Sequence, residues 1–265
     1  MRVFAEGVGL VGPGLHGWKG SRGALAGTDA YTRAPTTVAA SELLPQAERR
    51  RVGTPVKLAL AAGREAVDAA GRDIATMATV FASSSGDCDN VHHIFAALAS
   101  AERLVSPTRF HNSVHNAVAG YWSIAAKCRE ASTSLCCHDA SFAAGLLETT
   151  VQAGAGNGPV ALIAYDHPYP EPLNSARPVG GEFGVALILA PHEARHSAAA
   201  LDVEFVAGEA AATRMDDTGL EALRRAVPAA RSLPLLAALA GEGPATVILD
   251  YVAGTHLRIA VASCA

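Results

Sequence analysis

The residues best suited to chemistry lie together near the middle of the chain, in the segment Cys136-Cys137-His138-Asp139. Residues 131 to 136 before it have the pattern of a short strand, and residues 141 to 153 after it have that of an apolar helix. The first turn of a helix carries free N–H groups and the positive end of the helix dipole, which stabilise a nearby negative charge. Enzymes of several α/β classes place a nucleophile at such a strand-to-helix junction, so we take this one as the candidate site.

Each of these residues can also have an ordinary structural role. Asp139 can act as a helix N-cap, a role worth ~0.5–2 kcal/mol, and Cys136 and Cys137 can be buried free thiols. Adjacent side chains at the end of a strand point to opposite faces, so we do not expect His138 to pair with Asp139. The sequence has no Gly-x-Ser-x-Gly motif, which excludes the commonest hydrolase arrangement.

Two pairs of histidines precede this segment. His92 and His93 are adjacent and diverge by about 100° on a helix, so they cannot bind one ion from one face. His111 and His115 are four residues apart and can meet on one helical face. Because no carboxylate or cysteine visibly completes a ligand set, the sequence predicts a hydrogen-bonded interior pair, no metal site and no cofactor.

The elements that must position these residues alternate between strand and helix. Strands are predicted at residues 2–11, 76–82, 131–136, 160–165, 185–190, 200–206, 246–251 and 257–262. Helices are predicted at residues 54–70, 88–101, 114–126, 141–153, 219–226 and 233–239, with a surface excursion at 13–55 that contains a short helix near Ser41. This alternation predicts an α/β fold with a mainly parallel sheet covered on both faces. A polar connector at 191–197 suggests two parts, residues 1–195 and 196–265.

Composition narrows the function classes. The 265 residues are 50% hydrophobic and carry a net charge of -4, so no basic excess favours nucleic acid. No apolar run approaches the ~20 residues that a membrane span needs, and we expect no signal peptide. Five cysteines, an odd number without a C-x-x-C pair, are typical of reduced thiols, so we expect a cytoplasmic protein.

Five segments resemble, in order and with similar spacing, the β-ketoacyl synthases, which are condensing enzymes of the thiolase fold. They are RVFAEGVGLVGPGLHGW at 2–18, VKLALAAGREAVDAAGRD at 56–73, TVFASSSGD at 79–87, HNAVAGYWSIA at 115–125 and GGEFGVALILA at 180–190. The resemblance covers about residues 1 to 190. It implies a layered α-β-α-β-α arrangement of two related halves, with the first half complete and the second truncated.

The departures from this family concern the chemistry. In the synthases the strand ends in Thr-Ala-Cys, and that cysteine accepts the acyl chain; a gap-free register from residues 116–120 puts Asp139 there instead. A carboxylate cannot replace the thiolate, because its acylated product would be a reactive anhydride. Glu130-Ala131 stands where the family has Gly-Pro. The two helper histidines are also missing, since Gly254-Thr255-His256 resembles the family's His-Gly-Thr only in reversed order.

A synthase-like chain without nucleophile and helpers resembles a chain-length factor, the inactive partner of a true ketosynthase. The phrase HDASFAAGLLE at 138–148 resembles the short synthase-like proteins of aryl polyene and xanthomonadin-type pigment pathways. The resemblance implies a heterodimer with a catalytic β-ketoacyl synthase, which the acyl carrier protein reaches through the complex, and a tunnel that crosses the dimer. The tunnel or interface candidates are His111, His115, His138, Asp139, Ser141 and Phe142.

Two alternatives stay open. A two-residue shift of the register would make the chain an active condensing enzyme or acyltransferase with Cys137 as nucleophile. The chain could instead be a purely structural interaction subunit. In each case a truncated half leaves sheet edges and apolar helix faces exposed, which predicts obligate association and a homodimer when the chain is alone.

Overall fold

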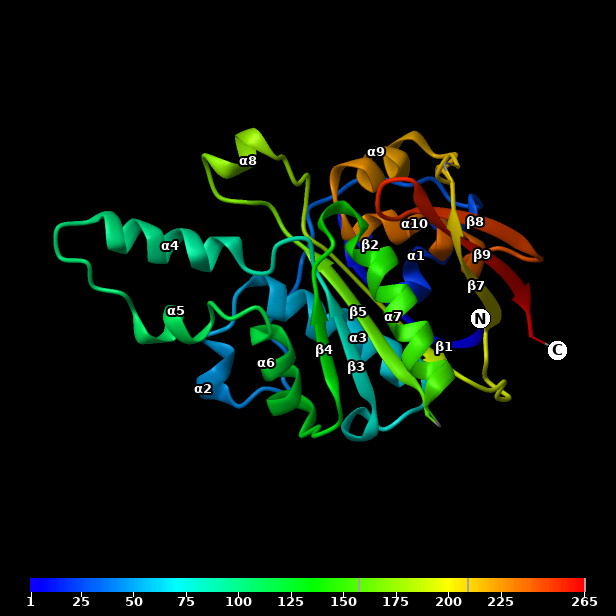
Figure 1. Ribbon diagram of the computed structural model, residues 1–265, viewed down its shortest axis with the longest axis horizontal. Coiled ribbons are helices and arrows are strands. Elements are labelled where there is room, and N and C mark those ends of the chain that lie inside the picture. The colour runs from blue at the N-terminus through cyan, green and yellow to red at the C-terminus, as the bar shows by residue number, and fades with distance from the viewer. Residues whose placement is uncertain (157, 209, 265) are drawn as a thin grey trace.

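Strand β1 lies in the middle of the sheet and pairs with strands on both sides (Figure 1). In the computed structural model, which describes residues 1–156, 158–208 and 210–264, the strands form one sheet in the order β4-β3-β5-β6-β1-β7-β9-β8, with β2 paired to β1. The strands are β1 (Arg2–Gly12), β2 (Leu15–His16), β3 (Ala78–Ala82), β4 (Ser132–Leu135), β5 (Val160–Asp166), β6 (Phe183–Ala190), β7 (Ala199–Ala207), β8 (Ala245–Asp250) and β9 (Thr255–Ser263).

Helices cover both faces of this sheet (Figure 1). The α-helices are α1 (Trp18–Ala26), α2 (Gln46–Arg49), α3 (Thr54–Ala70), α4 (Cys88–Ala99), α5 (Pro107–His111), α6 (Ala117–Ala126), α7 (Ser141–Ala155), α8 (Leu173–Ala176), α9 (Thr218–Ala226) and α10 (Leu233–Ala240). The 3₁₀ turns are η1 (Ile74–Thr76), η2 (His138–Ala140) and η3 (Ala229–Ser232). One core contains α3 and α6, and the other contains α7, η3 and α10.

Helix α3 approaches β1 closely because two strand residues have no side chain. A Cβ atom added at Gly7 would lie 2.1 Å from the carbonyl oxygen of Ala66, and one at Gly9 would lie 1.9 Å from that of Ala62. Both distances are shorter than any van der Waals contact, so only glycine permits this helix-to-sheet spacing. The first predicted strand and the helix from Thr54 to Ala70 are confirmed.

The prediction of a mainly parallel sheet is wrong. Among the strands of the described residues, only β3 pairs in parallel, with β4 and with β5, and the remaining pairs are antiparallel. Parallel neighbours need a long crossover, usually a helix, whereas short links return the chain in the opposite direction. The links from β8 to β9 and from β6 to β7 are short loops, and the link from β5 to β6 holds only the four-residue helix α8.

The strands after residue 196 extend the first sheet instead of forming a second one. Strand β7 pairs with β1, and β9 and β8 follow it outward, so the elements described here make helix, sheet and helix layers. This differs in layer number from the five layers that the resemblance implied. The predicted division at residues 195 and 196 lies in the loop between β6 and β7 and stays a prediction.

The predicted surface excursion contains an unpredicted helix, α1. Its sequence, WKGSRGALA, includes two glycines, which have low helix propensity. Contacts with α10 and the buried Leu25 stabilise it, so tertiary packing outweighs propensity. The other short helix, α2, lies at Gln46–Arg49 instead of near Ser41.

Helices α4 and α5 extend away from the sheet, and we call residues 88–111 the arm (Figure 1). Helix α4 buries only Asn90. Large apolar side chains are exposed along the arm, in the link that follows it and on α6: Phe95, Leu98, Leu104, Phe110, Val114 and Ile124. Within the described part of the chain, no helix is both long and apolar enough to span a bilayer.

Candidate functional site

The junction between β4 and α7 is a tight turn held by one side chain. The Ser141 hydroxyl accepts a hydrogen bond from the Cys137 N–H at 3.0 Å and donates one to the His138 carbonyl at 2.7 Å. His138 has a φ of 49°, a left-handed conformation uncommon for a residue with a side chain. Ser141 is therefore a structural residue of the turn, and it is buried.

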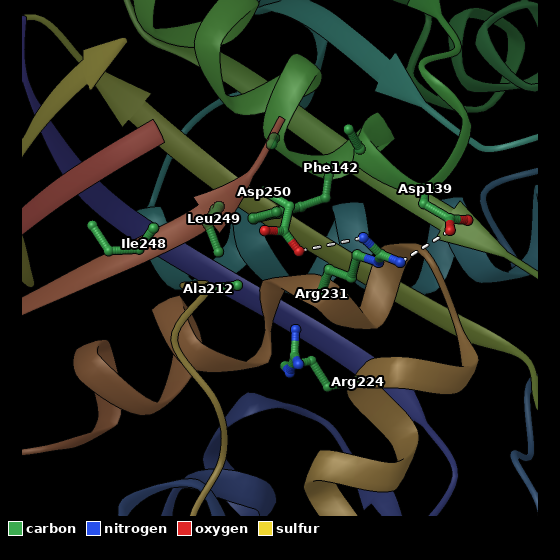
Figure 2. A pocket seen from close by; sticks show the side chains of 10 residues that line it. Asp139, Phe142, Ala212, Arg224, Arg231, Ile248, Leu249 and Asp250 are labelled. Atoms are coloured by element: carbon green, nitrogen blue, oxygen red, sulfur yellow. Dashed lines mark hydrogen bonds and ion pairs between the residues drawn. The ribbon is translucent and has the colours of Figure 1, made fainter. Parts of the chain in front are cut away.

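Asp139 projects from this turn toward two arginines from distant segments. Its Oδ1 accepts a hydrogen bond from Arg177 at 2.7 Å and its Oδ2 accepts one from Arg231 at 3.0 Å. Arg231 also faces Asp250 at 3.7 Å, and Figure 2 shows this arginine between the two carboxylates. The carboxylate oxygens bind guanidinium groups, and helix α7 begins without a side-chain cap. Asp139 is therefore not the helix N-cap that the sequence analysis considered.

The charge on Asp139 is stabilised. Burial raises the pKa of this carboxyl, but the Arg177 hydrogen bond and the positive charges of Arg231 and His138 outweigh burial and hold the pKa below its usual value. His138 Nδ1 lies 3.5 Å from Asp139 Oδ1, so the expectation that adjacent side chains diverge is wrong. The reason is that the chain turns into η2 here and does not continue as a strand.

Arg177 is itself held in place by Tyr169 in the proline-rich loop. Its guanidinium carbon lies 5.5 Å from the centre of the Tyr169 ring, and Nη1 donates a hydrogen bond to the Tyr169 hydroxyl. That hydroxyl lies 3.2 Å from the Ser84 Oγ, which donates to Asp166 at 2.7 Å. A polar chain therefore connects Asp139 with the carboxyl end of strand β5.

Asp166 is a buried carboxyl that the sequence analysis missed. It accepts hydrogen bonds from the Ser84 N–H at 2.9 Å and the Ala229 N–H at 2.8 Å, in addition to the hydroxyls of Ser83 and Ser84. Burial raises its pKa to about 6, although each of these hydrogen bonds acts to lower it. Asp166 thus joins β5 and the turn after β3 to η3.

The cavity beside Asp139 is small. The cavity lined by Asp139, Phe142 and Arg231 has a volume of about 10 Å³, which is enough for about one water molecule. Phe142 is fully buried in the core under α7. An acyl chain has no room here in the chain as it stands.

The thiol of Cys137 lacks the activation that a nucleophile needs. Burial raises its pKa, and the neighbouring Cys136 raises it further, so the thiolate is disfavoured. The Cys136 thiol is 3.0 Å from the Ser84 carbonyl oxygen. These features weigh against the alternative that uses Cys137.

His111 and His115 lie in a different place from Asp139. Helix α5 ends at His111 and α6 begins at Ala117, so the predicted helix from residue 114 begins later and the two histidines do not share a helical face. His111 lines a hollow of about 530 Å³ between α5 and α6, and His115 lines an adjacent cavity of about 20 Å³. The six predicted site residues therefore form two groups: Asp139 with His138, Ser141 and Phe142, and His111 with His115.

The structure has a mixed sheet with helices on both faces and a strand-turn-helix junction before α7, and the predicted thiolase-like fold class is confirmed. The family model described as β-ketoacyl synthase, N-terminal domain, matches residues 23–243. The chain therefore belongs to this family. No curated protein matches the sequence.

Solved structures confirm the fold. The chain is similar to a structure of the ketosynthase ApeO in complex with its chain length factor ApeC from Xenorhabdus doucetiae, with a TM-score of 0.72, 22% identity and 99% of both chains covered. It is also similar to the ishigamide ketosynthase/chain length factor, with a TM-score of 0.74, 17% identity and 100% and 99% of the two chains covered. A β-ketoacyl synthase from Burkholderia phymatum gives a TM-score of 0.67 at 13% identity, with 100% of both chains covered.

Proposed function

We propose that this chain is a non-catalytic chain-length factor that pairs with an active β-ketoacyl synthase of an aryl polyene type pathway. The observation that carries the proposal is that Asp139, which the sequence register aligns with the acyl-accepting cysteine, has one arginine on each carboxylate oxygen. A carboxylate held in this way is a poor nucleophile, and its acyl product would be an anhydride. The partner would supply the thiolate and the two helper histidines.

The arm is the surface that we assign to the partner synthase. Exposed apolar side chains on α4 and α5 would be buried by association, and a large exposed apolar patch usually marks an interface. Two of the similar structures, by their descriptions, contain a ketosynthase and a chain length factor. The pairing that we propose here agrees with the pairing in those two structures. When the chain is alone, a homodimer would form through the arm.

The hollow between α5 and α6 is the part that we propose to face the partner's growing chain. It is lined by apolar side chains such as Phe110, Val114 and Ile124, with His111 at its side. The cavity at Asp139 is too small for this role. Product length would then follow from sterics, because an additional unit that meets a side chain must displace packed atoms.

A glycine in this hollow allows a direct test. Gly120 lies on α6 in the hollow, and a Cβ added there meets no atom within 4 Å. We expect Gly120→Leu, coexpressed with the synthase, to leave the complex intact and to shorten the product. Gly20→Leu is the matched control, since Gly20 also lies on a helix with open space around it, and it should leave product length unchanged.

The results separate the three hypotheses. An intact Gly120→Leu complex with unchanged product length would contradict the steric role and favour a purely structural subunit. Acylation of the isolated chain at Cys137 by an acyl carrier thioester, detected by intact mass, would instead support the enzyme. A stable monomer at micromolar concentration that does not bind the synthase would refute the pairing.

A further inference from the structure

Arg177 and Arg231 are held near Asp139 by contacts that do not involve it. The ring and hydroxyl of Tyr169 hold Arg177, and Asp250 lies 3.7 Å from Arg231. Removal of the Asp139 carboxylate would therefore leave two guanidinium groups directed at one space. Arginine is the residue best suited to bind a carboxylate, because its N–H groups match the two oxygens.

The balance of charge around this space is also positive without Asp139. Arg224 lines the same cavity, as Figure 2 shows, and it already forms a two-bonded ion pair with Glu221. Asp250 is the other carboxylate that lines the cavity, and it reaches only one of the two arginines that bind Asp139. Two positive charges would then face one negative charge, which contacts Arg231 alone.

We propose that Arg177 and Arg231 form a carboxylate-binding site, which Asp139 occupies from within the chain. The internal carboxylate joins three segments: the start of α7, the proline-rich loop that carries Arg177, and η3 that carries Arg231. Asp139 is thus a positioning residue and not a remnant of a lost nucleophile. This inference does not rest on the partner or on product length, so it can fail while the proposed function stands.

The test uses the full chain with formate, the carboxylate that the change Asp139→Ala removes. We expect the thermal midpoint of this variant to rise by about 2 to 4 °C in formate at about tenfold its Kd, relative to chloride of equal ionic strength. The wild-type midpoint should be the same in both salts, because its site is filled. The double variant Asp139→Ala with Arg231→Ala should lose the response.

A surface ion pair with one arginine serves as control. Asp202 binds a single arginine, Arg2, whose side chain is 64% exposed, so Asp202→Ala should show no preference for formate. Equal midpoints of Asp139→Ala in formate and chloride, or an equal gain in Asp202→Ala, would overturn the proposal.

A second variant covers the case in which Asp139→Ala does not fold. Asp139→Asn keeps the shape of the side chain but loses the charge. Amide hydrogen exchange of this variant should be faster in both the proline-rich loop, residues 168–178, and η3. Faster exchange confined to the first turn of α7 would mean a local role for Asp139 and would refute the joining of three segments.

Discussion

The buried carboxyl of Asp166 makes a quantitative prediction about pH. Its pKa in the folded chain is about 6, against an ordinary value of 3.8, because burial outweighs the four hydrogen bonds that it accepts. The folded state therefore binds this proton more tightly than the unfolded state does. Its contribution to stability is fully present below about pH 4 and is lost as the pH rises through about 6.

The magnitude follows from the size of the shift. A difference of about two pKa units, at about 1.4 kcal/mol for each unit, corresponds to about 3 kcal/mol. We expect the stability of the wild type relative to Asp166→Asn to fall by about this amount between pH 4 and pH 7.5. The Asn variant carries a further, pH-independent cost of about 1–3 kcal/mol, because the Ser84 and Ala229 N–H groups both need an acceptor.

Urea unfolding of the wild type and of Asp166→Asn over this pH range measures the difference between their free energies of unfolding. The contributions of the other titrating groups cancel in this difference, because both proteins contain them. Glu221 is one of these groups, and its pKa is lowered to about 2, mainly by the hydrogen bond from Arg224. The contribution of Glu221 to the stability of the chain is therefore lost only in acid. A difference that is flat with pH would contradict the role of burial. A difference that grows with pH would mean that the hydrogen bonds prevail and that Asp166 is ionised throughout. If Asp166→Asn does not fold, the carboxyl ¹³C shift of the wild type gives the pKa directly.

Three further predictions concern the positions that carry the fold and the site. Asp139→Cys should place a thiol between two guanidinium groups, so its pKa should fall below the usual range and iodoacetamide should modify it about tenfold faster at pH 7 than the two native cysteines of the turn; an equal rate would contradict the cationic environment. Arg72→Ala should destabilise the chain by about 1–3 kcal/mol, because Glu6 is buried and binds this arginine through both oxygens, whereas Arg72 is 35% exposed and His196 also lies 3.7 Å from Glu6. Arg64→Ala, which breaks the exposed pair with Asp68, should cost less than about 0.5 kcal/mol in the same denaturation experiment, and similar costs would refute the reasoning. Gly9→Ala should abolish soluble folded protein, judged by circular dichroism, because its Cβ would lie 1.9 Å from a carbonyl oxygen; a folded variant with unchanged midpoint would show that α3 can move away from β1.

Much of the fold was predictable where the local signal is strong. The strands β1, β5 and β6 are apolar runs with Gly, Pro or Asp at their ends, and α3 has a proline in its first turn and Gly71 as its C-cap. The direction of strands was not predictable from alternation, because it depends on which links contain a helix long enough to cross the sheet. Helix α1 was missed because its stability comes from α10, more than 200 residues later.

The candidate site was predictable in position but not in chemistry. The spacing from residues 116–120 placed Asp139 at the turn, and the structure has it there. Its partners, Arg177 and Arg231, are 38 and 92 residues away in sequence, and neither lies in a pattern with a known role. Single-sequence reasoning cannot pair such residues, since their proximity is a result of the sheet order.

The two groups of predicted site residues suit the proposed function, in which the chain would lack acyl transfer and still act on the partner's product. The small cavity and the two ion pairs at Asp139 weigh against an acyl group held there. The open hollow at α5 and α6 is instead next to the apolar arm, where a second chain would bind. The hollow is lined mainly by apolar side chains, whereas the side chains around Asp139 form ion pairs. Substitutions at the hollow should therefore change product length, and substitutions at Asp139 should change stability. A product whose length responds to Asp139→Asn but not to Gly120→Leu, with both complexes intact, would reverse this assignment.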